Sequence, residues 1–241
     1  MIKAKFFSGL LFCVMSLLSA SSFGKGASIT GDNSVSVGVG LTNSNQADMD
    51  NLRSVHNANY GGISAGSLGS ALELYAQYQF RFSGTMFAML FRPSYFRQTS
   101  SGSGCNGSCE YNLNGFTFFP MFRMYPLENN FLGLFLQTGI GYGHLNGEII
   151  DGPNSVKFSG GNFGAAFGLG VDFCFTDTHC MTIEGTARYL PISRNVISSS
   201  GTGSLTGATQ AGSGQELEIG NSDFGTTMSG IMGIIGYTMA F

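Results

Sequence analysis

Eight segments of the chain alternate between apolar residues and small or polar ones, and this period of two limits the fold more than any other feature. A period of two places successive side chains on opposite faces of a β-strand. No segment after residue 30 shows a 3.6-residue period, so helices are not expected to build the fold. The eight segments cover residues 34–41, 72–82, 87–95, 116–124, 132–143, 163–173, 181–189 and 231–241.

Long and short links alternate between these segments. Short turns are expected at residues 83–85, 126–130 and 176–180, and long loops at residues 43–67, 99–111, 145–161 and 192–222. Short turns at one end and long loops at the other are typical of a barrel of the bacterial outer membrane. The sequence therefore predicts an all-β fold, an eight-stranded antiparallel up-and-down transmembrane β-barrel that forms a single domain over residues 25–241.

Composition indicates which face of the strands is outside. Only 10% of the 241 residues are charged, whereas a typical soluble domain has about 25%. A soluble barrel of the lipocalin type is the alternative, but its outer face would then consist mostly of Gly, Ser, Thr and Gln. The apolar face is nearly free of charge in all eight segments, as a lipid-facing surface must be. We therefore expect the apolar face to point outward.

The first 24 residues have the layout of a secretory signal peptide. Lys3 and Lys5 precede an apolar stretch at residues 6–18, and small residues follow it. Cleavage is expected within about residues 20–26, at those small residues. An uncleaved membrane anchor is the alternative, although the stretch is shorter than the roughly 20 residues that a spanning helix needs.

Export leaves two close cysteine pairs, and export favours disulfides. Cys105 with Cys109 is expected to form a disulfide on the outer side of the membrane, and Cys174 with Cys180 to close a turn on the inner side. A metal site is the alternative for the second pair, because His179 adjoins Cys180.

The C-terminus carries a resemblance to a known class. Tyr237, Met239 and the terminal Phe241 occupy alternate positions and resemble the C-terminal assembly signal of bacterial outer-membrane barrels. The glycine-rich segments 139–143 and 168–172 are similar to strands of the outer membrane protein A-like and opacity-type surface proteins. The resemblance implies a Gram-negative outer membrane, both mature ends in the periplasm, and contact with lipid, lipopolysaccharide and the barrel assembly machinery. It also implies a possible extracellular or host surface partner.

Seven charged residues fall on the inward parity, where they should pair in a narrow lumen. Arg81, Arg123, Asp172 and Glu184 are expected to form one network across the lower lumen. Glu73 and Arg92 are expected to form a second cluster higher up, with Arg188 nearby. Paired charges would plug the barrel.

No catalytic, metal or cofactor site is expected. Only three His are present, and none has a nucleophile and a base close in sequence. The net charge of −3 argues against a nucleic-acid partner. The sequence thus favours a non-enzymatic barrel with a structural or adhesin-like role and a plugged lumen. A small-solute or ion channel is the main alternative, and a lipid-modifying enzyme is a further one.

Overall fold

The computed structural model describes residues 32–241, except residues 106, 201–204, 208–211 and 221 and the side chain of Ser200. The expected signal peptide, residues 1–24, lies outside the described residues. Within the described part of the chain, no helix has the length and apolar character needed to cross a membrane.

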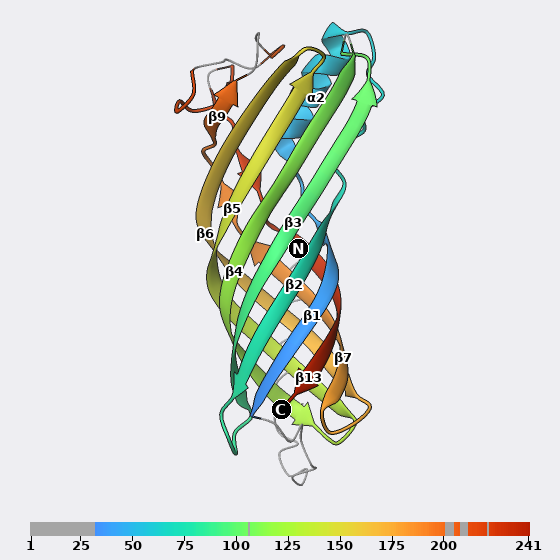
Figure 1. Ribbon diagram of the computed structural model, residues 1–241, viewed down its shortest axis with the longest axis vertical. Helices are drawn as coiled ribbons and strands as arrows, with labels where there is room; N and C mark the ends of the chain where they lie inside the picture. The colour runs from blue at the N-terminus through green and yellow to red at the C-terminus, as the bar shows by residue number, and fades with distance from the viewer. Residues whose placement is uncertain (1–31, 106, 201–204, 208–211, 221) are drawn as a thin grey trace, which may run out of the picture.

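Eight long strands form a closed antiparallel barrel (Figure 1). Each strand pairs with the next along the chain, and the last strand pairs with the first, where Ser34 lies opposite Ala240. This arrangement confirms the predicted eight-stranded up-and-down barrel. The strands are β1 (Asn33–Asn43), β2 (Ser70–Arg81), β3 (Phe87–Ser103), β4 (Ser108–Glu128), β5 (Leu132–Asp151), β6 (Asn154–Cys174), β7 (His179–Tyr189) and β13 (Gly230–Ala240).

Three short links connect β2 to β3, β4 to β5 and β6 to β7, and they lie at one end of the barrel, the turn end. The C-terminus lies at the turn end too, where the amide of Phe241 donates to the carbonyl of Asn33. We call the opposite end the loop end. An even number of strands brings both ends of the barrel to the same side, as the alternating links predicted.

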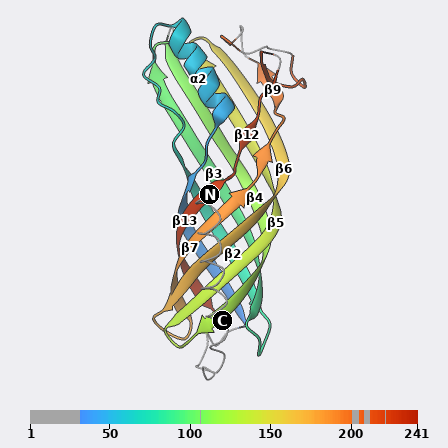
Figure 2. The same cartoon turned by 180° about the vertical axis from the view of Figure 1, so that it is seen from behind.

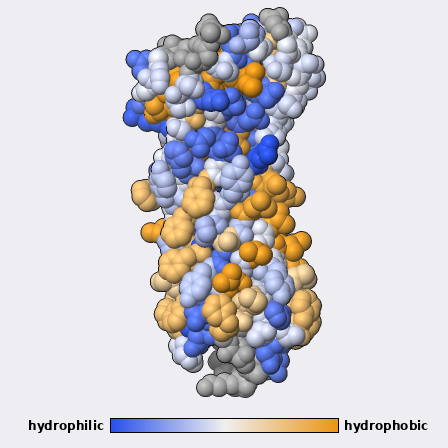
Figure 3. Space-filling model, in the orientation of Figure 1, coloured by the Kyte–Doolittle hydropathy of each residue, from blue (hydrophilic) through white to orange (hydrophobic). Residues whose placement is uncertain are grey.

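The apolar face of the strands points outward. Val37 on β1 is 54% exposed, whereas its neighbour Ser36 is 3% exposed, and the same alternation continues around the wall. Hydrophobic side chains gather on the wall toward the turn end, while the loop end is mostly hydrophilic (Figure 3). The wall therefore exposes a band suited to lipid, and its polar residues face the lumen.

Half of the wall is much taller than the rest. Strands β3 to β6 have 17–21 residues each, against 11–12 in β1, β2, β7 and β13. At ~3.3 Å per residue, the longest strands extend about 30 Å further. The segments 99–111 and 145–161, expected as long loops, are mostly strand with a tight turn at each tip, so that expectation was wrong. Their ladders run without interruption to Ser103–Ser108 and to Asp151–Asn154.

Helix α2 (Ala47–Asn59) and the described parts of residues 190–229, which we call the covering segment, cover the inner side of the tall wall formed by β3 to β6 (Figure 2). The helix was not expected, because it buries only Met49, Leu52 and His56 and so has a weak apolar period. Residues 190–229 contain the short strands β8 (Pro191–Ile192), β9 (Val196–Ser200), β10 (Glu218–Ile219), β11 (Ser222–Asp223) and β12 (Thr226–Thr227). Strand β9 extends the sheet by pairing with β6. We call this part the head: residues 44–69, 97–114, 145–160 and 190–229.

The hydrophobic face of the sheet inverts where the barrel passes into the head. Phe116 and Phe118 of β4 point outward, but Tyr111 and Leu113, further along the same strand, are fully buried and point inward. Strands β5 and β6 invert in the same way. The head therefore encloses an apolar core with a polar outside, as a water-soluble domain does. Its largest fully buried side chains are Met49, Leu52, Tyr111, Leu113, Leu145, Ile149, Phe158, Leu190 and Phe224.

Candidate functional site: a closed lumen beneath an apolar head

A two-point ion pair crosses the middle of the lumen. Arg92 on β3 donates to both carboxylate oxygens of Glu184 on β7, at 2.6 and 2.7 Å. The carboxylate also accepts from Gln137 at 2.7 Å and from Thr186 at 2.5 Å. Both charged side chains are nearly fully buried, with Glu184 3% exposed. Such a pair is geometrically well satisfied, and the contact spans strands that are not neighbours in the barrel.

Arg123 lies between two carboxylates, closer to the turn end. Its guanidinium nitrogens are 3.8 Å from Asp172 and 3.6 Å from Glu184. Tyr125 links the two sides, because it accepts from Arg123 and donates to Asp172 at 3.1 Å. The guanidinium also stacks over the ring of Phe135, 3.8 Å from its centroid. This part of the lumen is thus filled by rings and paired charges.

A second two-point ion pair closes the lumen nearer the head. Arg188 on β7 donates to Glu73 on β2 at 2.7 and 2.9 Å. Ser94 and Thr42 donate to the same carboxylate. The remaining guanidinium nitrogen, Nε, donates to the carbonyl of Met228 at 2.7 Å. This contact joins the barrel lumen to the covering segment of the head.

In the structure, several of the inward charged residues have other partners than the sequence predicts. Arg81 was expected in the lower network, but it forms a two-point ion pair with Glu128 at the rim of the turn end. Arg92 was expected beside Glu73, but it reaches across to Glu184, and Arg188 pairs with Glu73 instead. The partners of Arg92 and Arg188 differ because the closed barrel brings β2 and β3 opposite β7, which strand-by-strand counting does not reveal. Arg81 differs because Glu128, at the end of β4, was not among the charged residues that the prediction placed in the lumen.

Little free space remains between these groups. A gap lined by Glu73, Arg92 and Arg188 leaves about 10 Å³ for the centre of a water molecule, which is room for about one water. Inward glycines are covered by large side chains of neighbouring strands. A Cβ atom added at Gly141 would lie 2.6 Å from the ring of Phe119. The glycine-rich wall of β5 and β6 is therefore packed rather than hollow.

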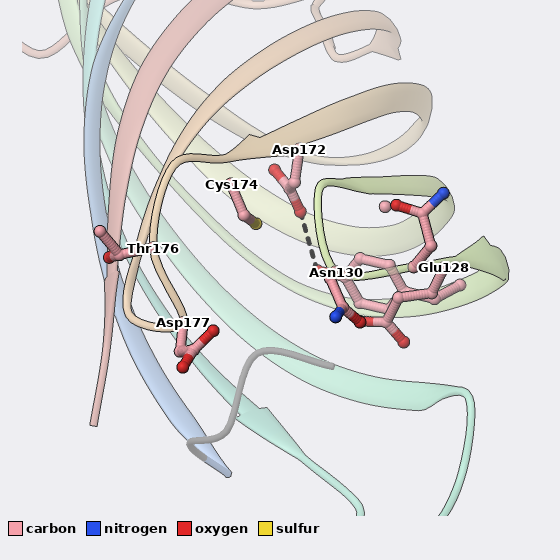
Figure 4. Close-up of a pocket in the computed structure, with 9 residues that line it drawn as sticks. Glu128, Asn130, Asp172, Cys174, Thr176 and Asp177 are labelled. Atoms are coloured by element: carbon pink, nitrogen blue, oxygen red, sulfur yellow. Dashed lines mark hydrogen bonds between the residues drawn. The ribbon is translucent and has the colours of Figure 1, made fainter. Parts of the chain in front are cut away.

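A polar hollow opens at the turn end (Figure 4). Asp172 and Cys174 on β6 and Glu128 on β4 line it, together with Asp177 of the β6–β7 turn. It too has room for about one water, about 10 Å³ for the water centre. Asp172 forms its floor, held there by Tyr125 and by Thr182.

Both expected disulfides are present. Cys174 and Cys180 lie directly opposite each other on β6 and β7 and close the turn between them. His179, the proposed alternative ligand, contacts the hydroxyl of Tyr237 at 2.6 Å. Cys105 and Cys109 close the tip of the β3–β4 hairpin in the head.

A buried polar cluster around His56 ties the covering helix to the tall wall. The ring Nε2 lies 2.8 Å from the carbonyl of Thr206, and Nδ1 lies 2.6 Å from the hydroxyl of Tyr111. A carbonyl can only accept, so Nε2 carries the proton and Nδ1 accepts from Tyr111. Asp151 lies 3.8 Å from Nε2 and accepts from the amide of Thr206. No sequence pattern pointed to this cluster, which four separate segments assemble.

Burial sets the protonation of this cluster. It lowers the pKa of His56, and the nearby carboxylate of Asp151 only partly opposes that shift. Burial also raises the pKa of the Tyr111 hydroxyl. Potential ligand atoms of His56, Cys105 and Asp151 lie within 4.8 Å of one another. The Cys105 sulfur is consumed by its disulfide, which leaves two donors, fewer than a closed zinc site uses.

The histidines do not form a catalytic arrangement in the described part of the chain. His56 contacts a phenol and a backbone carbonyl, and His179 contacts a phenol. His144 is exposed on the outward face of β5. Among the described residues, the hydrogen bonds of His56 and His179 involve no serine or cysteine side chain, which base-assisted nucleophilic catalysis would require.

Of the residues that resemble the assembly signal, Tyr237 and Met239 lie on the outward face of β13 and Phe241 follows its last residue. Tyr237, Met239 and Phe241 are 49%, 46% and 62% exposed. They continue the apolar band of the wall to its lower edge, beside the first strand, with which β13 pairs.

A closed eight-stranded barrel with an apolar outer band and a polar, filled lumen defines the class by its fold: the protein has the fold of the eight-stranded outer-membrane β-barrels. Among solved structures, the chain is similar to the outer membrane protein OprG from Pseudomonas aeruginosa, with a TM-score of 0.57 and 12% identity over 88% of this chain and 96% of that one. It is also similar to Ail, the attachment invasion locus protein of Yersinia pestis, with a TM-score of 0.40 and 11% identity over 88% and 99%.

A third similar structure is the N-terminal β-barrel domain of Pseudomonas aeruginosa OprF, with a TM-score of 0.37 and 9% identity over 88% of this chain and 98% of that one. At these identities the likeness concerns the fold alone, and of these three comparisons the one with OprG exceeds a TM-score of 0.5. No protein-family model matches the sequence. No curated protein matches it at a significant level.

Proposed function

We propose that the protein is a non-enzymatic component of the outer membrane whose sealed barrel anchors a rigid extracellular head with a structural or adhesive role. The observation that carries the proposal is the division of the interior. Three arginines and three carboxylates form ion pairs in the lumen, while large apolar side chains fill the inside of the head. The barrel is then an anchor, and the surface of the head is the part available to partners.

The orientation follows from the same proposal. The turn end and both ends of the barrel face the periplasm, and the head projects through the lipopolysaccharide layer, which surrounds its polar outer wall. The outward C-terminal residues Tyr237, Met239 and Phe241 serve the barrel assembly machinery. One partner of the head is lipopolysaccharide, and an extracellular or host surface is the other.

A conductance measurement tests the sealed lumen. Purified protein in planar lipid bilayers should show no steady current. A variant with Phe119→Ala and Met121→Ala, which removes two large lumen side chains, serves as the control and should show more frequent openings. A steady open channel in the unmodified protein would favour the channel alternative and overturn the sealed barrel.

Topology and role are tested on whole cells. An epitope inserted between Ser213 and Gly214 should bind antibody on intact cells, and one inserted beside Gly84 should bind only after permeabilisation. Deletion of the gene should reduce either attachment to surfaces or resistance to detergent. If deletion changes neither property, the structural or adhesive role is wrong.

A further inference from the structure

Within the described residues of the head, the buried titratable groups gather around His56, where α2 and the covering segment meet the tall wall. His56 is on α2, Thr206 follows on the covering segment, and Asp151 ends β5 at the tip of the tall wall. His56 and Asp151 are both fully buried. A single side chain therefore holds the helix, the covering segment and the wall together.

In the arrangement described above, in which Tyr111 donates to Nδ1, the ring of His56 is neutral. Nδ1 accepts the hydroxyl proton of Tyr111, so a second ring proton would place two donors face to face until that hydroxyl turns away. The carbonyl of Thr206 would remain bonded to Nε2. Protonation therefore reverses the bond to Tyr111, whose hydroxyl must turn and accept instead of donate, and it leaves a positive charge on a ring that the closed head buries completely.

The charged surroundings do not fully compensate a buried imidazolium. Asp151 is the only carboxylate near the ring among the described residues, at 3.8 Å, and its Oδ2 already accepts the amide of Thr206. Next to the ring on and after α2, the hydroxyl of Tyr60 shares a hydrogen bond with the hydroxyl of Thr206. Arg53 forms an ion pair with Asp50. From β4 the facing group is the neutral Tyr111. The cluster supplies one carboxylate that is beyond hydrogen-bond distance of the ring.

We infer that His56 is an acid-sensitive latch: its protonation releases α2 from the tall wall and gives water and partners access to the apolar interior of the head. The lumen pairs beneath stay closed, so the change concerns the head and not conduction. The sign follows from linkage. Burial lowers the pKa of His56 in the closed head, so proton uptake favours the open form, and closure weakens as the pH falls below the ordinary value of about 6.5.

Hydrogen exchange with mass spectrometry tests the latch in the full chain held in detergent micelles. After correction for intrinsic exchange, the amides of α2 should lose up to about 30-fold protection between pH 7.5 and pH 5.0, the limit for one proton taken up below pH 6.5. Amides of β1 should not change. His56→Gln keeps a donor and an acceptor but does not titrate, so its protection should be the same at both pH values.

Two further variants make the test specific. His144→Gln removes an exposed histidine of the outer wall and should retain the full response. Asp151→Asn removes the only carboxylate near the ring among the described residues and should widen the difference between the two pH values. Equal pH dependence in the unmodified protein and in His56→Gln would overturn the latch. Higher α2 protection at acid pH would overturn it as well, because the imidazolium would then pair with Asp151 and tighten the head.

The NMR signals of the imidazoles provide a measurement that needs no His56 variant. The chain has only three His, so selective labelling gives three assignable rings. The His56 ring should take up its proton over the same pH range in which α2 loses protection. A His56 ring that stays neutral at pH 5.0 while α2 opens would assign the opening to another group and refute the inference.

Discussion

The effects of removing Arg92 and of removing Glu184 on the free energy of unfolding should be strongly coupled, because removal of either residue leaves the charge of the other buried without its partner. Removal of Arg92 leaves Glu184 with Gln137, Thr186 and the more distant Arg123. Removal of Glu184 leaves the Arg92 guanidinium with its two hydrogen bonds to Gln77. Breaking a buried pair costs about 3–5 kcal/mol, so we expect about 3 kcal/mol for Arg92→Ala and about 5 for Glu184→Ala.

The double variant leaves neither of these two charges buried without its partner. Its cost is the lost packing and the unpaired amides of Gln77 and Gln137, so we expect it to fall about 3 kcal/mol below the sum of the single variants. Arg92→Lys keeps the charge but loses the two-point contact and should cost less than Arg92→Ala.

Urea unfolding in lipid vesicles, followed by far-UV circular dichroism because the chain has no Trp, gives the free energies of unfolding. The exposed pair of Lys157 and Glu148, 3.3 Å apart, is the matched control and should show coupling of at most about 0.5 kcal/mol. Additive costs at Arg92 and Glu184, within about 0.5 kcal/mol, would refute the reasoning. The charges would then be hydrated separately, and the channel alternative would be favoured.

Three other predictions concern packing, the hairpin disulfide and assembly. Gly141→Val should destabilise the barrel by about 1–3 kcal/mol, measured by the same unfolding assay, since its side chain would collide with Phe119; an unchanged midpoint would show that the lumen has spare room. Mass spectrometry of unreduced peptide 100–115 should show the loss of two hydrogens at Cys105 and Cys109, and free thiols there would contradict the disulfide. Removal of Phe241 should lower the amount assembled in cells while refolding of purified protein changes little, because its side chain is 62% exposed; equal loss in both assays would indicate a role in stability instead.

The barrel, its apolar outer face and its polar inner face could be predicted because all three depend on the local sequence pattern. A strand has a period of two whatever surrounds it, and lipid accepts only apolar side chains, so residues such as Val37 and Phe118 show their direction in the sequence. The short turns and the cysteine pairs are also local features. Neither requires knowledge of which strand lies opposite which.

The head was missed although its sequence carries a signal. Along β4 the apolar parity changes from Phe116 and Phe118 to Tyr111 and Leu113, and the polar residue Asn112 takes the outward position. Such an inversion marks the level at which lipid outside is replaced by water, because the wall must then hide its apolar face inside. An interpretation that follows one apolar parity along each strand ends the strand at the inversion. It therefore predicts loops at segments 99–111 and 145–161, where the strands in fact continue.

The chain by itself determined the strand pattern, the outward apolar band and the identity of the inward charges, because each depends on a residue and its near neighbours. Only the tertiary structure decided the partners of those charges. Arg92 meets Glu184 and Arg188 meets Glu73 because closure of the barrel brings β2 and β3 opposite β7. The His56 cluster likewise forms only when α2, the covering segment and the two wall strands fold together. Contacts between residues more than 90 positions apart depend on how the barrel closes, and a local pattern contains no information about that closure.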